Sequence, residues 1–110
     1  MKFHIKDDMF STNVTSVDLS EKEVDYIVML VSGVKDKNIK ELLNLKHSDL
    51  ESLFQKFGLT NKHRVRDMQL TTVMCMNGLI TPELIMQTYK RFDLIELKEM
   101  IDFYKTGKRG

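Results

Sequence analysis

The stretch centred on Asn44 constrains the fold of this chain more than any other, because apolar side chains recur at helical spacing on both sides of it. Ile39 and Leu43 lie one helical turn apart before this residue, and Leu50 and Leu53 lie one turn apart after it. Asparagine tolerates the left-handed backbone that a sharp turn between helices requires. The pattern predicts two short helices that meet at a steep angle around a shared apolar corner, which is the layout of a helix-turn-helix.

Helix start and stop signals along the rest of the chain predict an all-α fold. Ser20 and Glu23 form a capping box for a first helix that ends at Gly33, and Ser48 and Glu51 repeat the S-x-x-E pattern at the start of the third helix. We therefore expect six helices, which start at the Ser20 cap, at the Asp36 cap, after Ser48, at about residue 62 behind an Asn61 cap, at Thr81-Pro82-Glu83, and at an Asp93/Glu96 cap.

These signals divide the chain into three parts. Residues 1–18 form an N-terminal arm, in which the alternating polar and apolar side chains are compatible with a short strand, an ordered arm or a frayed coil. Residues 19–80 form a core of four helices that contains the helix-turn-helix. Residues 81–110 add two C-terminal helices, which either wrap back onto the core or pair with a second chain.

Composition excludes several classes of protein. No apolar run approaches the roughly 18 residues of a membrane span, and the N-terminus lacks a signal-peptide core, so we expect a cytoplasmic protein without membrane contact. Cys75 is the single cysteine and lies in an apolar stretch, which predicts a buried thiol. The three histidines have no metal-ligand spacing, and no nucleophile is paired with a base, so we expect no metal, no cofactor and no enzymatic activity. The methionines at helical spacing, among them Met68 and Met76, are expected to fill the core.

Four short motifs occur in an order that resembles the LuxR/GerE-type DNA-binding domains. Leu19-Ser20-x-Lys22-Glu23 matches the opening L-T/S-x-R-E of that family, and Gly33 follows the glutamate at the family's interval of ten residues. Lys56-Phe57-Gly58-Leu59-x-Asn61-Lys62 is similar to the K-L-G-V-x-N-R signature, and Gly78-Leu79-Ile80 is similar to the terminal G-L-I. The K-F-G-L match implies a recognition helix one turn shorter than in the family, whereas an ungapped register places Gly58 inside that helix. The resemblance implies a small transcription regulator that binds duplex DNA.

Charge is concentrated where this function would need it, since residues 34–66 hold eight basic and four acidic residues, a net charge of +4. With Leu50 and Leu53 inward, the outward side chains that would contact base edges are Lys46, His47, Ser48, Glu51, Ser52 and Gln55. The side chains that would hold phosphates are Lys35, Lys37, Lys56, Lys62, Arg64 and Arg66, the last three within a basic cluster.

Two acidic residues leave a second function open. Asp49 and Glu51 suit the helix dipole at the start of the third helix, but they repel phosphates on the surface that would face DNA. The alternative is an anti-activator or co-regulator of the same fold that docks another transcription regulator and does not bind DNA specifically. In either case we expect a homodimer, formed through the two C-terminal helices, because readers of DNA commonly bind as dimers.

Overall fold

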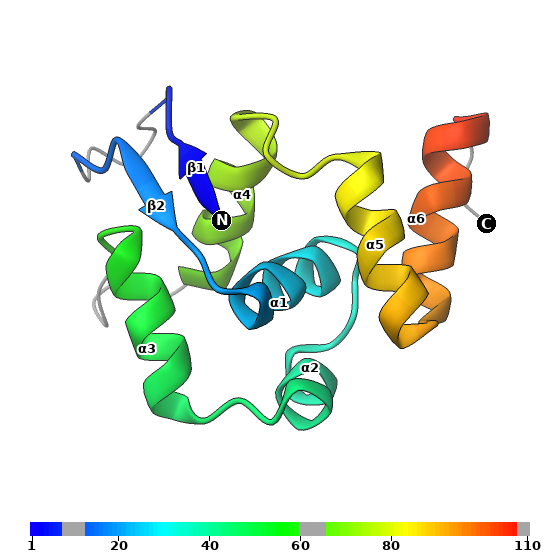
Figure 1. Cartoon of the computed structure of the whole chain (residues 1–110), viewed down its shortest axis with the longest axis horizontal. Coiled ribbons are helices and arrows are strands. Elements are labelled where there is room, and N and C mark those ends of the chain that lie inside the picture. The colour runs from blue at the N-terminus through cyan, green and yellow to red at the C-terminus, as the bar shows by residue number, and fades with distance from the viewer. Residues whose placement is uncertain (8–12, 60–65, 108–110) are drawn as a thin grey trace.

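Figure 1 shows the computed structural model of the chain. Helix α1 lies at the centre with the other helices around it, and a small sheet near the N-terminus leads into the start of α1. The structure describes residues 1–7, 13–59 and 66–107. The mostly helical content of this part confirms the expected all-α class. In chain order the elements are β1 (Lys2–His4), β2 (Ser16–Asp18), α1 (Glu21–Val31), α2 (Asp36–Leu43), α3 (His47–Lys56), α4 (Arg66–Met76), α5 (Pro82–Phe92) and α6 (Ile95–Thr106).

The described part of residues 1–18 forms a two-stranded antiparallel sheet, so a strand is the correct one of the three alternatives. Phe3 of β1 lies opposite Val17 of β2, and the buried Val17 side chain packs into the core. The terminal ammonium group of Met1 lies 3.1 Å from the Asp18 carboxylate and donates a hydrogen bond to the Leu19 carbonyl at 3.0 Å. The sheet therefore leads directly into the start of α1.

Helix α1 begins and ends as its sequence predicts. The Ser20 hydroxyl accepts a hydrogen bond from the Glu23 amide at 3.2 Å, and the Glu23 carboxylate accepts one from the Ser20 amide at 2.9 Å, which completes the capping box. Gly33 has φ +96° just beyond the helix, a backbone conformation that favours glycine. Ile27 and Val28 are fully buried, and α1 contacts α2, α4 and α5.

Helices α2 and α3 are separate elements that run in different directions, as the pattern around Asn44 predicted (Figure 1). Asn44 adopts the left-handed conformation, with φ 53° and ψ 50°, directly after Leu43 ends α2. Its left-handed backbone turns the chain, and Lys46 becomes the N-cap of α3. The helix-turn-helix connection therefore consists of Asn44, Leu45 and Lys46.

The expected cap of α3 is wrong. The helix starts at His47, and the Asp49 carboxylate accepts a hydrogen bond from the Lys46 amide at 2.8 Å, so the cap lies two residues before Ser48. Because the turn fixes the N-cap at Lys46, the acid three residues later is Asp49, and Glu51 is released from capping. The helix ends at Lys56 and Gly58 follows with φ +71°, which corresponds to the shorter of the two registers.

Helix α4 is described from Arg66 onward, and its expected start behind Asn61 lies outside the described residues. Its buried side chains are Leu70, Val73 and Met74, which share one helix face. The expectations for three other residues of this helix are wrong, because they project away from that face: Cys75 is exposed, and Met68 and Met76 are each 63% exposed.

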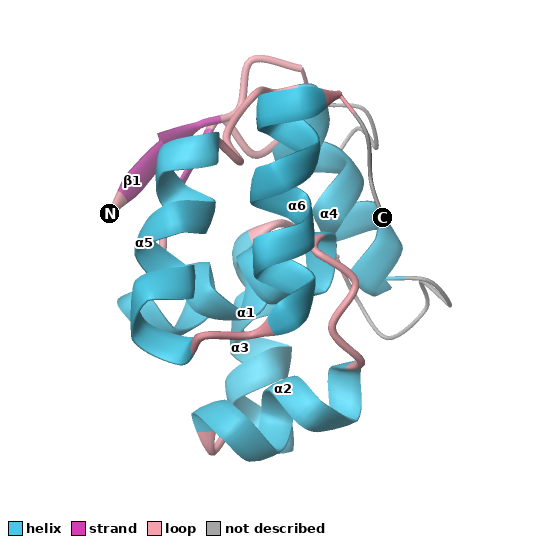
Figure 2. Cartoon of the chain, turned by 90° about the vertical axis from the view of Figure 1, so that its right-hand side faces the viewer, coloured by secondary structure: helices cyan, strands magenta, loops and turns pink. Residues whose placement is uncertain are grey.

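Helices α5 and α6 complete the core, as one of the two alternatives for the C-terminal extension proposed. The two helices lie side by side, and α5 also packs on α1 (Figure 2). The Thr81 hydroxyl caps α5 by accepting a hydrogen bond from the Leu84 amide at 3.2 Å.

Asp93 does not cap α6 as expected, because it ends α5 in the left-handed conformation, with φ 48°, and Leu94 becomes the N-cap of α6. Leu97 and Ile101 of α6 are buried, but Tyr104 is 48% exposed. In the part of the chain that the structure describes, every helix is too short or too polar to cross a bilayer.

Candidate nucleic-acid interface

Helix α3 has one apolar and one polar face, and its packing decides which side chains are accessible. Leu50, Leu53 and Phe54 are buried against the rest of the fold. These residues recur at intervals of three and four, which places them on one side of the helix. The opposite side consequently faces solvent.

The accessible side of α3 carries uncharged hydrogen-bonding groups. Ser48, Ser52 and Gln55 are exposed, and their side chains have no hydrogen-bond partner within the described residues. Lys46 and His47, at the start of the helix, are exposed as well. Five of the six side chains predicted to contact bases therefore lie together on one accessible surface, which we call the α3 polar face (Lys46, His47, Ser48, Ser52 and Gln55).

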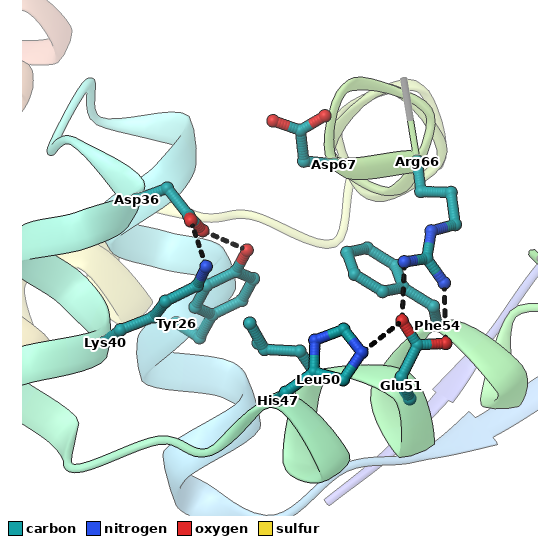
Figure 3. A pocket seen from close by; sticks show the side chains of 9 residues that line it. All are labelled: Tyr26, Asp36, Lys40, His47, Leu50, Glu51, Phe54, Arg66 and Asp67. Atoms are coloured by element: carbon teal, nitrogen blue, oxygen red, sulfur yellow. Dashed lines mark hydrogen bonds and ion pairs between the residues drawn. The ribbon is translucent and has the colours of Figure 1, made fainter. Parts of the chain in front are cut away.

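The sixth, Glu51, is bound to a residue of another helix. Its carboxylate accepts two hydrogen bonds from the Arg66 guanidinium, from Nη2 to Oε1 at 2.6 Å and from Nη1 to Oε2 at 2.9 Å (Figure 3). The two side chains are only 21% and 17% exposed. The Arg66 guanidinium also stacks on the Phe54 ring, 4.4 Å from its centroid. This bidentate pair joins the middle of α3 to the start of α4.

Each partner of this pair changes the ionisation of the other. The two hydrogen bonds from Arg66 lower the pKa of Glu51 below its ordinary value, and the bonds to Glu51 raise the pKa of Arg66. Both groups are therefore charged at neutral pH. His47 lies one turn before Glu51, with Nε2 3.6 Å from Oε1, but its side chain is 86% exposed.

Apart from Arg66, which is bound to Glu51, the predicted phosphate-binding residues fall into three groups. Lys35 and Lys37 are exposed at the start of α2. The Lys56 ammonium group donates hydrogen bonds to the Glu23 carboxylate at 2.7 Å and to a backbone carbonyl of β2 at 3.0 Å, which fixes the end of α3 against the start of α1. Lys62 and Arg64 lie outside the described residues.

A shallow pocket of about 280 Å³ opens between α2, α3 and α4, beside the Glu51–Arg66 pair (Figure 3). On its α2 side the buried Tyr26 hydroxyl donates a hydrogen bond to the Asp36 carboxylate at 2.8 Å, and Lys40 lies 2.7 Å from the same carboxylate. Burial, followed by the hydrogen bond to Asp36, raises the pKa of Tyr26 far above its ordinary value. The carboxylate of Asp67 faces the pocket from α4. Two ion pairs thus form opposite walls.

A second bidentate pair links α1 to α5 on the other side of the molecule. The Asp25 carboxylate is 4% exposed and accepts hydrogen bonds from the Arg91 guanidinium at 2.6 and 2.7 Å. Arg91 also donates to Glu21 at 2.8 Å. Our sequence analysis missed this pair, although an acidic residue within the apolar run of the first helix is a signal that a buried partner is needed.

Within the described ranges, no group of three or more histidine, cysteine, aspartate or glutamate side chains is arranged to hold a metal ion. Comparison of the chain with protein families, with characterised proteins and with solved structures gives no match in any of the three. The resemblance to the LuxR/GerE-type domains therefore depends on the four sequence motifs alone.

Proposed function

We propose that the protein is a small transcription regulator that binds duplex DNA through the α3 polar face. The observation that carries this proposal is the set of three exposed side chains, Ser48, Ser52 and Gln55, which make no hydrogen bond to the described part of the chain and lie on a helix anchored by its opposite side. Serine and glutamine exchange hydrogen bonds with base edges in the major groove, which admits an α-helix. The exposed Lys35, Lys37 and Lys46 supply positive charge for phosphates at the starts of α2 and α3.

The test is selection of bound duplexes from a random pool, followed by affinity measurements at several salt concentrations. We expect a motif to be enriched and the affinity for it to fall with salt. The triple variant Ser48→Ala/Ser52→Ala/Gln55→Ala should lose about tenfold or more in preference for the motif over random duplex, because a bidentate base contact of the kind that glutamine makes contributes roughly 1–3 kcal/mol of discrimination. Gln87→Ala, an exposed position on α5, is the matched control and should bind as the parent does.

Absence of an enriched motif together with absence of salt-sensitive binding would refute this function. That result would favour the second candidate, a co-regulator that docks another transcription regulator. The observation in favour of the second candidate is the charge of α3 and its cap, where Lys46 and Lys56 balance Asp49 and Glu51. A surface without net charge suits a protein interface better than a phosphate backbone.

We further propose that the protein is a homodimer that associates through α6. Ile95 is 62% exposed, Phe103 41% and Tyr104 48%, and the two aromatic rings contact each other edge to face, with their centroids 6.0 Å apart. Exposed apolar side chains on one helix are typical of an association surface. Sedimentation should show a dimer that Phe103→Glu dissociates, and a monomeric parent at high micromolar concentration would contradict this proposal.

A further inference from the structure

We propose that Arg66 is a positioning residue for DNA binding, which neutralises Glu51 at the edge of the α3 polar face and does not itself hold a phosphate. This inference rests on the proposed DNA-binding function and assigns opposite roles to two residues that the sequence placed together in the interface. Glu51 acts against DNA binding, and Arg66 cancels that effect.

The geometry of the Arg66 guanidinium favours the pair with Glu51 over a phosphate contact. Both of its terminal nitrogens donate to the Glu51 carboxylate, at 2.6 and 2.9 Å, and one of its faces covers the Phe54 ring. Only 17% of the side chain is exposed. A phosphate that took the same end-on pair of nitrogens would have to displace Glu51 first, and the low exposure of the side chain restricts access to its remaining N–H groups.

The second argument is the position of Glu51. It lies one turn after His47 and directly before Ser52, at the border between the α3 polar face and the side of the helix that packs on α4. Its lowered pKa keeps the carboxylate ionised at neutral pH. An ionised carboxylate without a partner at this point would repel the phosphates on both sides of the groove. The pair therefore converts a negative point on the surface into a neutral one.

The third argument is that the same pair orients α3. Arg66 holds the middle of α3 at the start of α4, while Lys56 holds its last turn through Glu23. Ser48, Ser52 and Gln55, whose side chains have no hydrogen-bond partner among the described residues, extend from the side of this segment opposite its buried apolar side chains. Loss of Arg66 removes one of the two polar anchors and exposes the carboxylate, and both changes act against binding.

The experiment measures the slope of log affinity against log salt for the selected duplex, with the parent protein and five variants. A phosphate contact contributes about 0.9 to this slope, so that the ratio of the affinities at 50 and 200 mM salt changes by roughly 3.5-fold for each unit charge. Glu51→Gln releases Arg66 and should bind more tightly with a steeper slope. Arg66→Gln should bind more weakly with a shallower slope.

The double variant Glu51→Gln/Arg66→Gln separates neutralisation from direct contact. If Arg66 neutralises Glu51, the double variant has the parental slope, because both charges are gone. If Arg66 holds a phosphate, the double variant has the shallow slope of Arg66→Gln, and this result overturns the inference. The exchange variant Glu51→Arg/Arg66→Glu preserves the pair and should also have the parental slope, so that it tests the inference even if Arg66→Gln fails to fold.

The matched control is Lys90→Gln, which removes the same charge from an exposed position on α5, on the side of the molecule away from α3 (Figure 1). We expect it to leave the slope unchanged. The two proposals fail differently in this design. A parent protein that binds no duplex in a salt-sensitive manner refutes DNA binding itself, whereas a parent that binds together with a double variant of shallow slope refutes only the role of Arg66.

Discussion

The ion pair between Asp25 and Arg91 gives the sharpest prediction about stability, because it joins α1 to α5 across the core. We expect Arg91→Met to destabilise the fold strongly, since it retains most of the side-chain volume but leaves a carboxylate that is 4% exposed without its two hydrogen-bond donors. The neighbouring contact between Arg91 and Glu21 contributes little, because Glu21 is 77% exposed.

The magnitude follows from the burial of the two partners. Removing one member of a fully buried pair costs about 3–5 kcal/mol. Arg91 itself is 40% exposed, so water can approach the carboxylate once the guanidinium is gone, and we expect the lower end, about 3 kcal/mol. For a chain of 110 residues, with an unfolding entropy of about 2.1 cal/mol/K per residue, this loss lowers the Tm by roughly 13 °C.

Thermal and urea unfolding, followed by circular dichroism, measure this loss directly. Lys90→Met is the matched control, an adjacent exposed lysine on the same helix, and should shift the free energy of unfolding by less than about 0.5 kcal/mol. The double variant Asp25→Leu/Arg91→Met removes both charges and should recover most of the stability. A loss below about 1 kcal/mol in Arg91→Met, or a double variant as unstable as the single one, would refute the reasoning.

Three further predictions concern local features. Tyr26 has a raised pKa in the folded protein, so its contribution to the free energy of unfolding is complete below its ordinary pKa of 10.0 and is lost as the pH rises above that value. Tyr26→Phe should therefore show a smaller decrease of the free energy of unfolding between neutral and alkaline pH than the parent does. Glu51 has a lowered pKa in the folded protein, so its contribution to the free energy of unfolding is complete above its ordinary pKa of 4.5 and is lost as the pH falls below that value. The free energy of unfolding of Glu51→Gln should therefore decrease less in acid than that of the parent. Asn44→Val should cost about 1–2 kcal/mol in urea unfolding, whereas Asn44→Gly should not, because only the branched side chain opposes the left-handed backbone.

The sequence was most informative where a structural feature depends on residues close together in the chain. The Ser20–Glu23 capping box, the left-handed Asn44 and the Thr81 cap each involve positions within three residues of one another, and the structure confirms all of them. Apolar spacing likewise identified the buried side of α3, because a helix has a fixed period.

Features that depend on tertiary contacts could not be predicted in the same way. Glu51 and Arg66 are 15 residues apart, and their pairing follows from how α3 and α4 pack, which no local pattern encodes. The predicted cap of α3 was wrong because two overlapping pairs, Lys46 with Asp49 and Ser48 with Glu51, have the same spacing. The turn at Asn44 decides between these pairs, and this choice releases Glu51 for Arg66.

The bonds made by Lys56 have a consequence for how α3 adjusts to a partner. Its ammonium group ties the last turn of the helix to Glu23 and to the backbone of β2, whereas the first turn, within the described residues, is held by the buried Leu50 side chain and by the Asn44 connection. The last turn of α3 is therefore held more firmly than the first, and the pair between Glu51 and Arg66 holds the middle of the helix. Small tilts would displace Ser48 more than Gln55, so the leading end would accommodate variation in the contacted surface while the trailing end would keep a constant position.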